Sequence, residues 1–432
     1  MTAGRPSVYF SADNETESQY DADPMRALRR ALFWCHLAAG SLAGAVIFTM
    51  CVTGVLLAFQ PQVLRFVERG VRRVPETGRP RPTAEPIPAG TLLRLAAEAS
   101  PGTAPTAVTV SSDPAEAAAV VFGRERTIFL DRSTGAVLGS AASGWRTFFG
   151  EVQDIHRWLA FSEKSRPAGK AITGAANLLF FGLALSGLYI WWPRLRGIRR
   201  ISSVGLFQRR LSGKARDFNW HNVIGVWTAL PLVVITLTGM VMSYRWAGDL
   251  VYRAFGDVPP PAPTAGGRQG GGNPGAEARP LTAGDAAALD GLWRIAEKRA
   301  PGWRAITLRL PESGKSAVTF SIEEARFLNR FARSSLTLDA KSGAVTRWEP
   351  YAEAAAGRQA RSWMRFLHTG ESLGFFGQLV AALASLGGAV LAVTGIALSL
   401  RRLQAWRARR AAEISTDQGN DDELQPVKGA TG

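Results

Sequence analysis

The residues best suited to chemistry in this chain are its four histidines, His36, His156, His221 and His368. Each lies at the start of a long apolar segment or in the short stretch that leads into one. An imidazole is costly to bury in hydrocarbon unless something binds it, so four imidazoles in equivalent places favour ligation of a cofactor. The alternative is a set of interfacial histidines with ordinary hydrogen-bond partners, copied by duplication.

A haem iron fits this set better than zinc does. Zinc favours Cys, Asp or Glu beside its imidazoles, and the apolar segments contain no carboxylate. A haem iron needs only two axial imidazoles and a flat apolar slot. Covalent haem attachment by this chain is excluded because it has no C-x-x-C-H sequence. Cys35 and Cys51 would lie roughly 24 Å apart on one helix, too far for a disulfide, and are interpreted as buried apolar residues.

The elements that must position these histidines are membrane helices. Four segments of the 432-residue chain contain no Asp, Glu, Lys or Arg. Each exceeds the roughly 20 residues that a helix needs to cross a bilayer. They predict transmembrane helices at 31–60, 169–193, 220–244 and 372–400. The first is too long for a signal peptide and is interpreted as a retained anchor.

The distribution of basic residues predicts the orientation, because Lys and Arg concentrate in cytoplasmic segments. The chain has a net charge of +16, and basic residues cluster at three helix boundaries. Arg26, Arg29 and Arg30 precede the first helix, eight basic residues stand against Asp217 alone between the second and third, and five arginines follow the fourth. This indicates topology rather than nucleic-acid binding. It predicts a bacterial inner-membrane protein with both termini cytoplasmic. The cytoplasmic segments would be 1–25, 194–219 and 401–432, and the periplasmic ones 65–168 and 246–368.

The chain contains the same unit twice. His36 and His221 are each followed four residues later by a glycine, Gly40 or Gly225, and further along by a Thr-Gly pair. The second helix of each half carries a matching Ser-Gly or Thr-Gly pair. Because the first and third helices run in the same direction, the halves are expected to be parallel repeats related by an axis along the membrane normal.

The two external connections also repeat. Each contains a helical stretch, a Pro-Gly breaker, alternating apolar segments and a D-x-x-x-G turn, Asp131–Gly135 or Asp339–Gly343. This pattern predicts a small α+β domain at about 88–140 and another at about 283–348. Residues 264–275 are interpreted as a Gly-rich linker. Composition indicates disorder at 1–25 and over 415–425. The fold class is therefore a mainly α membrane protein with four helices and two periplasmic α+β domains.

The pseudo-twofold symmetry predicts which histidines meet. His36 would pair with His221 on the cytoplasmic side, and His156 with His368 on the periplasmic side. Gly40 and Gly225 lie one helical turn beyond the cytoplasmic histidines, where a missing side chain would admit a macrocycle. Close helix–helix packing through small residues is the alternative for these glycines.

Arginines surround the periplasmic histidines in the sequence. Arg157 and Arg365, with Arg146 and Arg361, would pair with haem propionates or attract an anionic substrate. Snorkelling to lipid phosphate is the alternative.

These helix-entry histidines, the duplication and the D-x-x-x-G domains resemble the PepSY-associated transmembrane family, over residues 26–405. That family includes iron-regulated inner-membrane proteins and siderophore reductases of the ferrioxamine-reductase type. The resemblance implies a b-type cytochrome with two haems per chain, whose iron ligands would be His36, His221, His156 and His368. It implies electron transfer to ferric siderophore in the periplasm. No flavin domain is fused to this chain, so the donor would be a separate cytoplasmic reductase or the quinol pool.

The expected function is therefore reduction of Fe(III) in a periplasmic ferric siderophore, with release of Fe(II). This reaction needs no acid–base residue, so no catalytic side chain is assigned. Two alternatives remain. One is a membrane cytochrome that serves another periplasmic acceptor. The other is a haem-free scaffold that binds a periplasmic partner through its PepSY-like domains.

Overall fold

The computed structural model forms two compact units, each built from segments far apart in the sequence. The helical unit comprises the described parts of Met1–Val55, Ile155–Ser243 and Phe376–Gly432, and the sheet unit comprises those of Leu56–Asp154 and Tyr244–Phe375. The structure describes residues 24–75, 85–123, 126–191, 205–261, 281–311, 317–324 and 332–423. The predicted linker 264–275, residues 194–204 of the basic segment 194–219, and residues 1–23 of the terminal segment 1–25 that was expected to be disordered lie outside these ranges.

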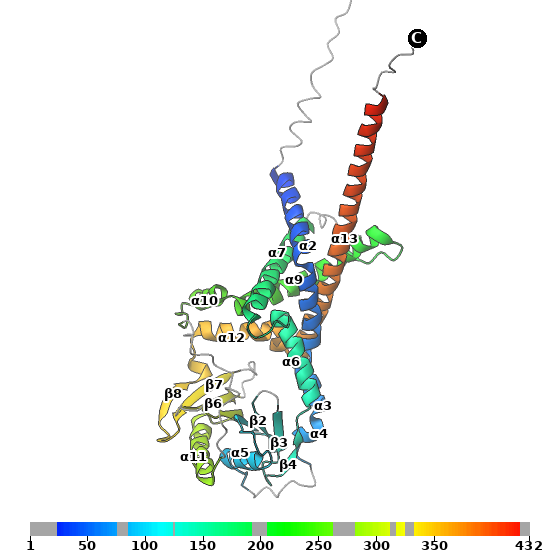
Figure 1. The fold of residues 1–432 in the computed structure, drawn as a ribbon. Helices are drawn as coiled ribbons and strands as arrows, with labels where there is room; N and C mark the ends of the chain where they lie inside the picture. Colours follow the sequence, from blue (N-terminus) through cyan, green and yellow to red (C-terminus); the bar gives the residue numbers. More distant parts are fainter. Residues whose placement is uncertain are drawn as a thin grey trace, which may run out of the picture. The chain divides into compact units, whose positions relative to one another are not determined.

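Four long helices supply the helical unit, and each is long and apolar enough to cross a membrane. The backbone of such a segment must satisfy its own polar groups in lipid, which a helix achieves. Figure 1 shows these helices running beside one another. They are α2 (Pro24–Ala58), α7 (Arg166–Trp191), α9 (Gly213–Ser243) and α13 (Gly374–Glu423). The prediction of a multi-pass membrane protein is confirmed.

The helix ends differ from the predicted ones. The helix α2 begins at Pro24, α9 begins at Gly213, and α13 continues to Glu423 through most of the segment 415–425 expected to be disordered. The flanking sequences are rich in Ala, Leu, Arg and Glu, which are strong helix formers. The absence of charge identifies the bilayer-spanning part of a helix and carries no information about where the helix stops.

Small residues bring the membrane helices close together. A Cβ atom added to Gly44 of α2 would lie 2.9 Å from Ile396 of α13, and one added to Gly388 of α13 would lie 2.7 Å from Cys51. Side chains at these positions would push the helices apart. Both thiols are free, as the sequence predicts, and Cys51 is buried. The expected burial of Cys35 is wrong, because Cys35 lies on an exposed face of α2.

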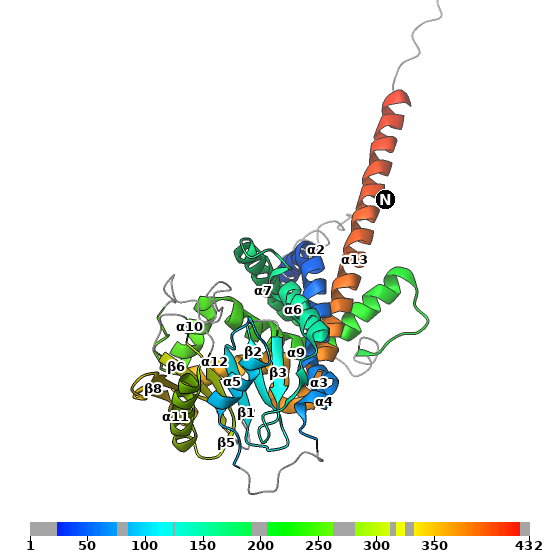
Figure 2. The same cartoon turned by 60° about the horizontal axis from the view of Figure 1, so that its bottom comes forward.

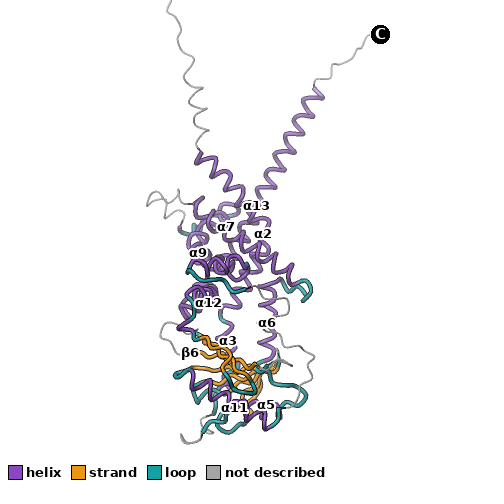
Figure 3. The backbone as a smooth tube through the Cα atoms, turned by 90° about the vertical axis from the view of Figure 1, so that its left-hand side faces the viewer, coloured by secondary structure: helices purple, strands orange, loops and turns teal. Residues whose placement is uncertain are grey.

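The sheet unit contains one eight-stranded antiparallel sheet in the order β4-β3-β2-β1-β5-β6-β7-β8 (Figure 2). The helices α5 (Ala89–Glu98) and α11 (Ala283–Arg299) lie on the same side of the strands (Figure 3). Alternate strand residues and these helices share one apolar core. The strands are β1 (Ala107–Ser111), β2 (Ala118–Phe122), β3 (Arg126–Leu130), β4 (Val137–Ser140), β5 (Trp303–Arg309), β6 (Ala317–Glu324), β7 (Arg333–Asp339) and β8 (Val345–Glu349).

The two predicted α+β domains share this sheet. Each contributes a helix and four strands, and the halves join through antiparallel β1 and β5, with Val108 opposite Leu308 at the centre. Thr109 and Thr307 exchange a hydroxyl hydrogen bond of 2.9 Å across the same junction. The strand order reads the same outward from this pair in both directions. Joining the halves protects what would otherwise be two exposed strand edges.

The D-x-x-x-G turns form as predicted. Gly135 and Gly343 have φ of +75° and +67°, a conformation that favours glycine. The carboxylate of Asp131 accepts the backbone N–H of Ser133 at 2.8 Å, and that of Asp339 accepts the N–H of Ser342 at 2.8 Å. These contacts fix the turns between β3 and β4 and between β7 and β8.

Shorter helices complete the structure. Those between α2 and β1 and after β4 are α3 (Gln60–Val67), α4 (Arg69–Arg72) and α6 (Ser143–Trp158). Those in the second half are α10 (Arg245–Ala254), the 3-10 turn η3 (Tyr351–Glu353), α12 (Ala356–Thr369) and the 3-10 turn η4 (Glu371–Leu373).

We predict that Gly90→Ala destabilises the sheet unit by about 1–3 kcal/mol. Gly90 lies where α5 meets α11, its backbone N–H donates to Asp290 at 2.6 Å, and an added Cβ would overlap the Ala286 carbonyl oxygen. The measurement is thermal unfolding of the detergent-purified chain, followed by circular dichroism.

The matched control is Gly291→Ala on α11, where an added Cβ meets no atom within 4 Å. It should leave the transition unchanged or raise it slightly, because alanine favours helix over glycine. Equal transitions for the two variants would show that the α5–α11 contact is not tight.

Candidate functional site

The helical unit brings two of the four histidines together. His36 on α2 and His221 on α9 have ring centroids 6.4 Å apart and ring planes inclined by 81°. Both side chains are half-buried. The two rings that were predicted to pair therefore lie close together in the structure.

A hydroxyl group on a neighbouring helix holds each ring. Nδ1 of His36 lies 2.8 Å from Ser186 Oγ on α7, and Nδ1 of His221 lies 2.9 Å from Thr394 Oγ1 on α13. Each imidazole is thus tied to the second membrane helix of its own repeat. No other side chain in the described part of the chain hydrogen-bonds to either ring.

The hydrogen-bond geometry selects one tautomer of His221. The single hydroxyl hydrogen of Thr394 points back to the Val390 carbonyl oxygen at 2.8 Å, so its oxygen accepts from the ring. Nδ1 of His221 therefore carries the proton and Nε2 keeps its lone pair. Ser186 makes a longer bond of 3.3 Å to the Leu183 carbonyl, and the same arrangement follows for His36. A lone pair on Nε2 with Nδ1–H fixed by an oxygen is the state in which histidine binds metals.

His156 on α6 is held in the same way. Its Nδ1 lies 2.9 Å from Thr53 Oγ1 on α2, and the Thr53 hydroxyl also lies 2.7 Å from the Thr49 carbonyl oxygen. Three of the histidines thus bind the hydroxyl of a Ser-Gly or Thr-Gly pair. Sequence reasoning noted these pairs as part of the repeat and assigned them no role. The signal was a hydroxyl residue repeated at one position in every membrane helix.

The glycine of each pair lies against the ring that its neighbour holds. A Cβ atom added to Gly187 or Gly395 would lie 3.4 Å from Cε1 of His36 or His221, and one added to Gly54 would lie 3.7 Å from Cε1 of His156. These are contact distances, so each imidazole lies directly against the glycine backbone of the neighbouring helix.

Gly40 and Gly225 occupy equivalent places beside leucines. An added Cβ would lie 3.8 Å from Leu183 at Gly40 and 3.6 Å from Leu391 at Gly225, which are ordinary contact distances. The close approach of α2 to α13 occurs at Gly44 instead. The role of Gly40 and Gly225 at a macrocycle remains a prediction.

A buried carboxylate paired with two exposed arginines links α9 to α13 near His221. The carboxylate of Asp217 receives Arg401 at 2.9 Å and Arg216 at 3.0 Å. Asp217 lies four residues before His221, and Arg401 lies seven residues after Thr394, so the ion pair and the imidazole–hydroxyl bond share one helix interface. Two contacts along that interface fix the register in which the ring meets its hydroxyl.

The remaining predicted site residues fall into separate places. Arg157 follows His156 and packs its guanidinium over the Trp158 ring, 4.3 Å from the centroid. His368 and Arg365 belong to α12 of the sheet unit, whereas His156 belongs to the helical unit. The pairing of His156 with His368 stays a prediction.

Arg146 has a different role from the one the sequence suggested. Its guanidinium binds the fully buried Glu68 carboxylate through two contacts, of 2.6 and 3.0 Å, and Arg72 binds the same carboxylate. Burial alone would raise the pKa of Glu68, but the hydrogen bonds and charges of Arg146 and Arg72 outweigh it and hold the pKa below its ordinary value. Arg146 is a structural ligand of this carboxylate.

Comparison with known protein families matches one model, described as the PepSY-associated TM region, across residues 33–402. That match covers most of the 432 residues. The chain belongs to the PepSY-associated transmembrane family. The matched region of this family member includes all four histidines and the Ser-Gly and Thr-Gly pairs. No curated protein matches the chain.

We predict that Glu68→Gln lowers the stability of the sheet unit by about 1–3 kcal/mol at neutral pH, because two partly buried guanidinium groups lose their counter-charge. The folded pKa of Glu68 lies below its unfolded value, so its contribution is complete above the unfolded pKa. It is lost as pH falls through the folded pKa. Thermal unfolding between neutral and acidic pH should show the two proteins converging in acid.

Glu116→Gln, at an exposed carboxylate on the same unit, is the control and should leave the transition unchanged. A constant difference between wild type and Glu68→Gln down to strong acid would contradict the assignment of the pH dependence to Glu68.

Proposed function

We propose that the protein is a b-type membrane cytochrome with two haems per chain, and that it passes electrons across the inner membrane to reduce Fe(III) in periplasmic ferric siderophores. The observation that carries the proposal is the His36–His221 pair, whose ring centroids lie 6.4 Å apart and whose Nδ1 atoms are both fixed by hydroxyl groups. The second haem is inferred from the internal repeat, and the siderophore substrate is inferred from the resemblance to the family.

The separation of the two rings fits a shared iron atom. A metal lies about 2 Å from an imidazole nitrogen, and that nitrogen lies about 1 Å from its ring centre, so two imidazoles on one metal have centroids about 6 Å apart. The observed centroid distance is 6.4 Å. Rotation of each ring about its own metal–nitrogen bond leaves this distance unchanged, so an inclination of 81° is compatible with it.

The chemistry of the donor set favours haem over a bare metal ion. Across the described residues, no group of three or more His, Cys, Asp or Glu side chains could hold a metal ion. Two imidazoles suffice for an iron whose other four ligands come from a macrocycle. When bound, a haem would supply a one-electron redox couple, and two imidazole ligands suit electron transfer rather than oxygen binding.

The chain's own residues would orient the ligands and tune their strength. Ser186 and Thr394 accept the Nδ1–H bonds, which fixes each ring plane and raises the basicity of Nε2. Gly187 and Gly395 supply the flat backbone on which the rings rest. His156, held by Thr53, and His368 would supply the second, periplasmic pair. Gly40 and Gly225 would border the macrocycle, and Arg157 would face its propionates.

For reduction of the substrate, the protein would only have to hold the ferric siderophore near the periplasmic haem. A siderophore holds Fe(III) through hard oxygen ligands, and one electron converts it to Fe(II), for which those ligands have lower affinity. No bond to the protein forms. The electrons would come from a separate cytoplasmic reductase or from quinol.

We predict that the purified protein contains two b-type haems per chain and that His221→Ala or His36→Ala retains one. Loss of either axial imidazole leaves the cytoplasmic iron with one protein ligand and weakens binding at that site only. The measurement is a pyridine haemochrome assay with reduced-minus-oxidised absorption spectra, referenced to protein mass.

Cys35→Ala, beside His36 on the exposed side of α2, is the matched control and should keep both haems. A well-folded protein that binds no haem after reconstitution would contradict the proposal and leave the haem-free scaffold. Two haems without reduction of any ferric siderophore would leave a cytochrome for another acceptor.

We predict that Thr394→Val raises the midpoint potential of the cytoplasmic haem and lowers its retention about tenfold, because an imidazole without its Nδ1 acceptor is a weaker donor. Thr394→Ser should preserve both properties. Potentiometric titration followed in the visible spectrum measures the potential.

Thr49→Val is the control, because the Thr49 hydroxyl is exposed and bonds to the Ala45 carbonyl. Equal potentials for Thr394→Val and Thr394→Ser would show that the hydroxyl does not act on the ligand.

A further inference from the structure

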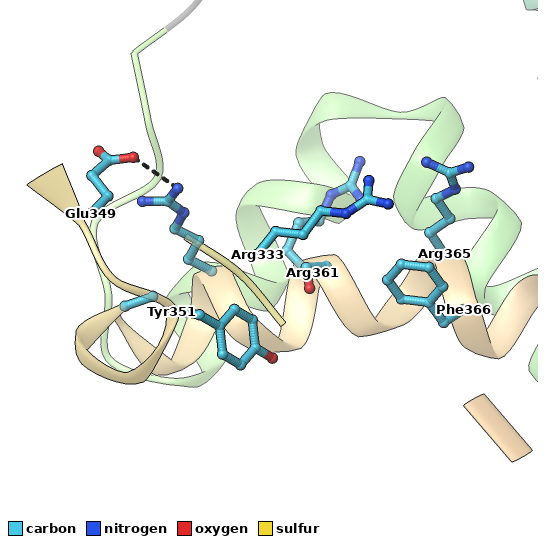
Figure 4. Close-up of a pocket in the computed structure, with 9 residues that line it drawn as sticks. Arg333, Glu349, Tyr351, Arg361, Arg365 and Phe366 are labelled. Carbon is cyan, nitrogen blue, oxygen red and sulfur yellow. Dashed lines mark ion pairs between the residues drawn. The ribbon is translucent and has the colours of Figure 1, made fainter. Parts of the chain in front are cut away.

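One face of α12 carries a row of arginines. Arg358, Arg361 and Arg365 follow one another at intervals of three and four residues, which places them on one side of the helix. Arg361 and Arg365 project from that side, and Arg333 at the start of β7 extends along the helix toward them (Figure 4). These four side chains line a cavity of about 300 Å³ in the sheet unit.

The cavity has an excess of positive charge. Its one carboxylate, Glu349, binds Arg358 at 2.8 Å and also binds Arg347 outside the cavity. Burial alone would raise the pKa of Glu349, but hydrogen bonds and attraction from both arginines outweigh it, and the pKa lies below its ordinary value. Glu349 is therefore ionised and already neutralised. Arg333 is paired with Glu323.

The other two arginines of the row, Arg361 and Arg365, have no such partner among the described residues. Within the described part of the chain, no carboxylate forms an ion pair with Arg361 or Arg365. Arg361 is half-buried, and Arg365 is exposed and lies near the Phe366 ring, 5.8 Å from its centroid. Two guanidinium groups directed at one cavity, without a protein counter-ion, form a binding site for an oxyanion.

The other half of the repeat lacks this site. When His156 is aligned with His368, the positions of Arg361 and Arg365 are Phe149 and Gln153 on α6. Phe149 is buried in apolar surroundings. If these arginines served a role common to both halves, such as contact with lipid phosphate, arginines would be expected at the equivalent positions of the first half. The charge is specific to the second half and indicates a ligand that binds only there.

The remaining lining chemistry limits the ligand. Tyr351 and Phe366 supply aromatic walls, and Ser362 supplies a hydroxyl group. The volume of about 300 Å³ admits a compact molecule and excludes a polymer. A small ligand with several carboxylate oxygens satisfies both guanidinium groups and the hydroxyl.

We infer that this cavity binds the acceptor, and that the acceptor is a compact anionic Fe(III) complex of the polycarboxylate or hydroxycarboxylate class. The identity of the metal rests on the proposed function, whereas the anionic character rests on the cavity alone. The complex takes up one electron from the reductase or quinol donor through the protein, and Fe(III) becomes Fe(II). The carboxylate ligands leave unchanged apart from protonation by water.

Binding of gallium(III) citrate to the full-length protein in neutral detergent tests the inference without any redox step, because Ga(III) is not reduced. Isothermal titration calorimetry should show saturable binding. Each of Arg361→Gln and Arg365→Gln should weaken it about tenfold or more, as expected for loss of a charge-assisted hydrogen bond. Arg361→Lys should recover part of the loss, because lysine keeps the charge without the planar fork.

The control for charge is the double variant Arg94→Gln/Arg309→Gln, at two arginines of the same unit that do not line the cavity. Its affinity should equal that of wild type. If the control and Arg361→Gln/Arg365→Gln lost equal affinity for gallium(III) citrate, the effect would come from the overall charge of the protein. The proposed binding site would then be wrong.

Three further measurements distinguish an iron complex from a lipid headgroup as the bound anion, and separate this inference from the proposed function. A cationic gallium trihydroxamate should bind at least about tenfold more weakly than the citrate complex, and equal binding would overturn the inference. If the arginine variants lose retention of phosphatidylglycerol in nanodiscs while their citrate affinity is unchanged, the cavity is a lipid site and the inference fails. The haem count of every variant is measured in parallel: binding without haem would refute the proposed function alone, and haem without binding would refute this inference alone.

Discussion

The hydrogen bond from an imidazole Nδ1 to a hydroxyl on another helix is the interaction on which the account depends. A histidine among apolar helices must satisfy two ring nitrogens, and the bundle satisfies one of them with Ser186, Thr394 or Thr53. The hydroxyl hydrogens are turned to the backbone of their own helices, so the rings donate. The second nitrogen is thereby left as an acceptor at a defined place. The same bond links helices and prepares a metal ligand, which explains why hydroxyl residues and glycines recur together in the membrane helices.

The sheet unit shows the duplication as a single structure. Its two halves meet at β1 and β5, and α5 packs against α11 above the junction through Gly90. The halves have then diverged at their edges. The first uses Arg146 to bind the buried Glu68, and the second directs Arg361 and Arg365 at a cavity. A shared scaffold therefore carries an ion pair in one half and a cationic cavity in the other.

Much of the fold could be predicted from the sequence, because its strongest signals are local. Long uncharged segments identified α2, α7, α9 and α13, and the D-x-x-x-G spacing identified the turns at Gly135 and Gly343. The alternation of apolar residues shows which face of a strand is buried, but it does not show which strand lies beside it. The pairing of β1 with β5 therefore could not be predicted from the sequence. The partners of Arg146 and His221 lie 78 and 173 residues away, on elements whose adjacency follows from packing alone. The proximity of His36 and His221 was predictable because the repeat supplied the symmetry that one sequence copy lacks.

The most direct test of the central claim is the low-temperature electron paramagnetic resonance spectrum of the air-oxidised full-length protein. Two imidazoles on one iron, with planes as steeply inclined as the 81° between His36 and His221, should give a highly anisotropic low-spin ferric signal. That signal should disappear in His36→Ala and remain in Cys35→Ala. A high-spin ferric signal in the wild type, or a low-spin signal that survives His36→Ala unchanged, would contradict axial ligation by this pair.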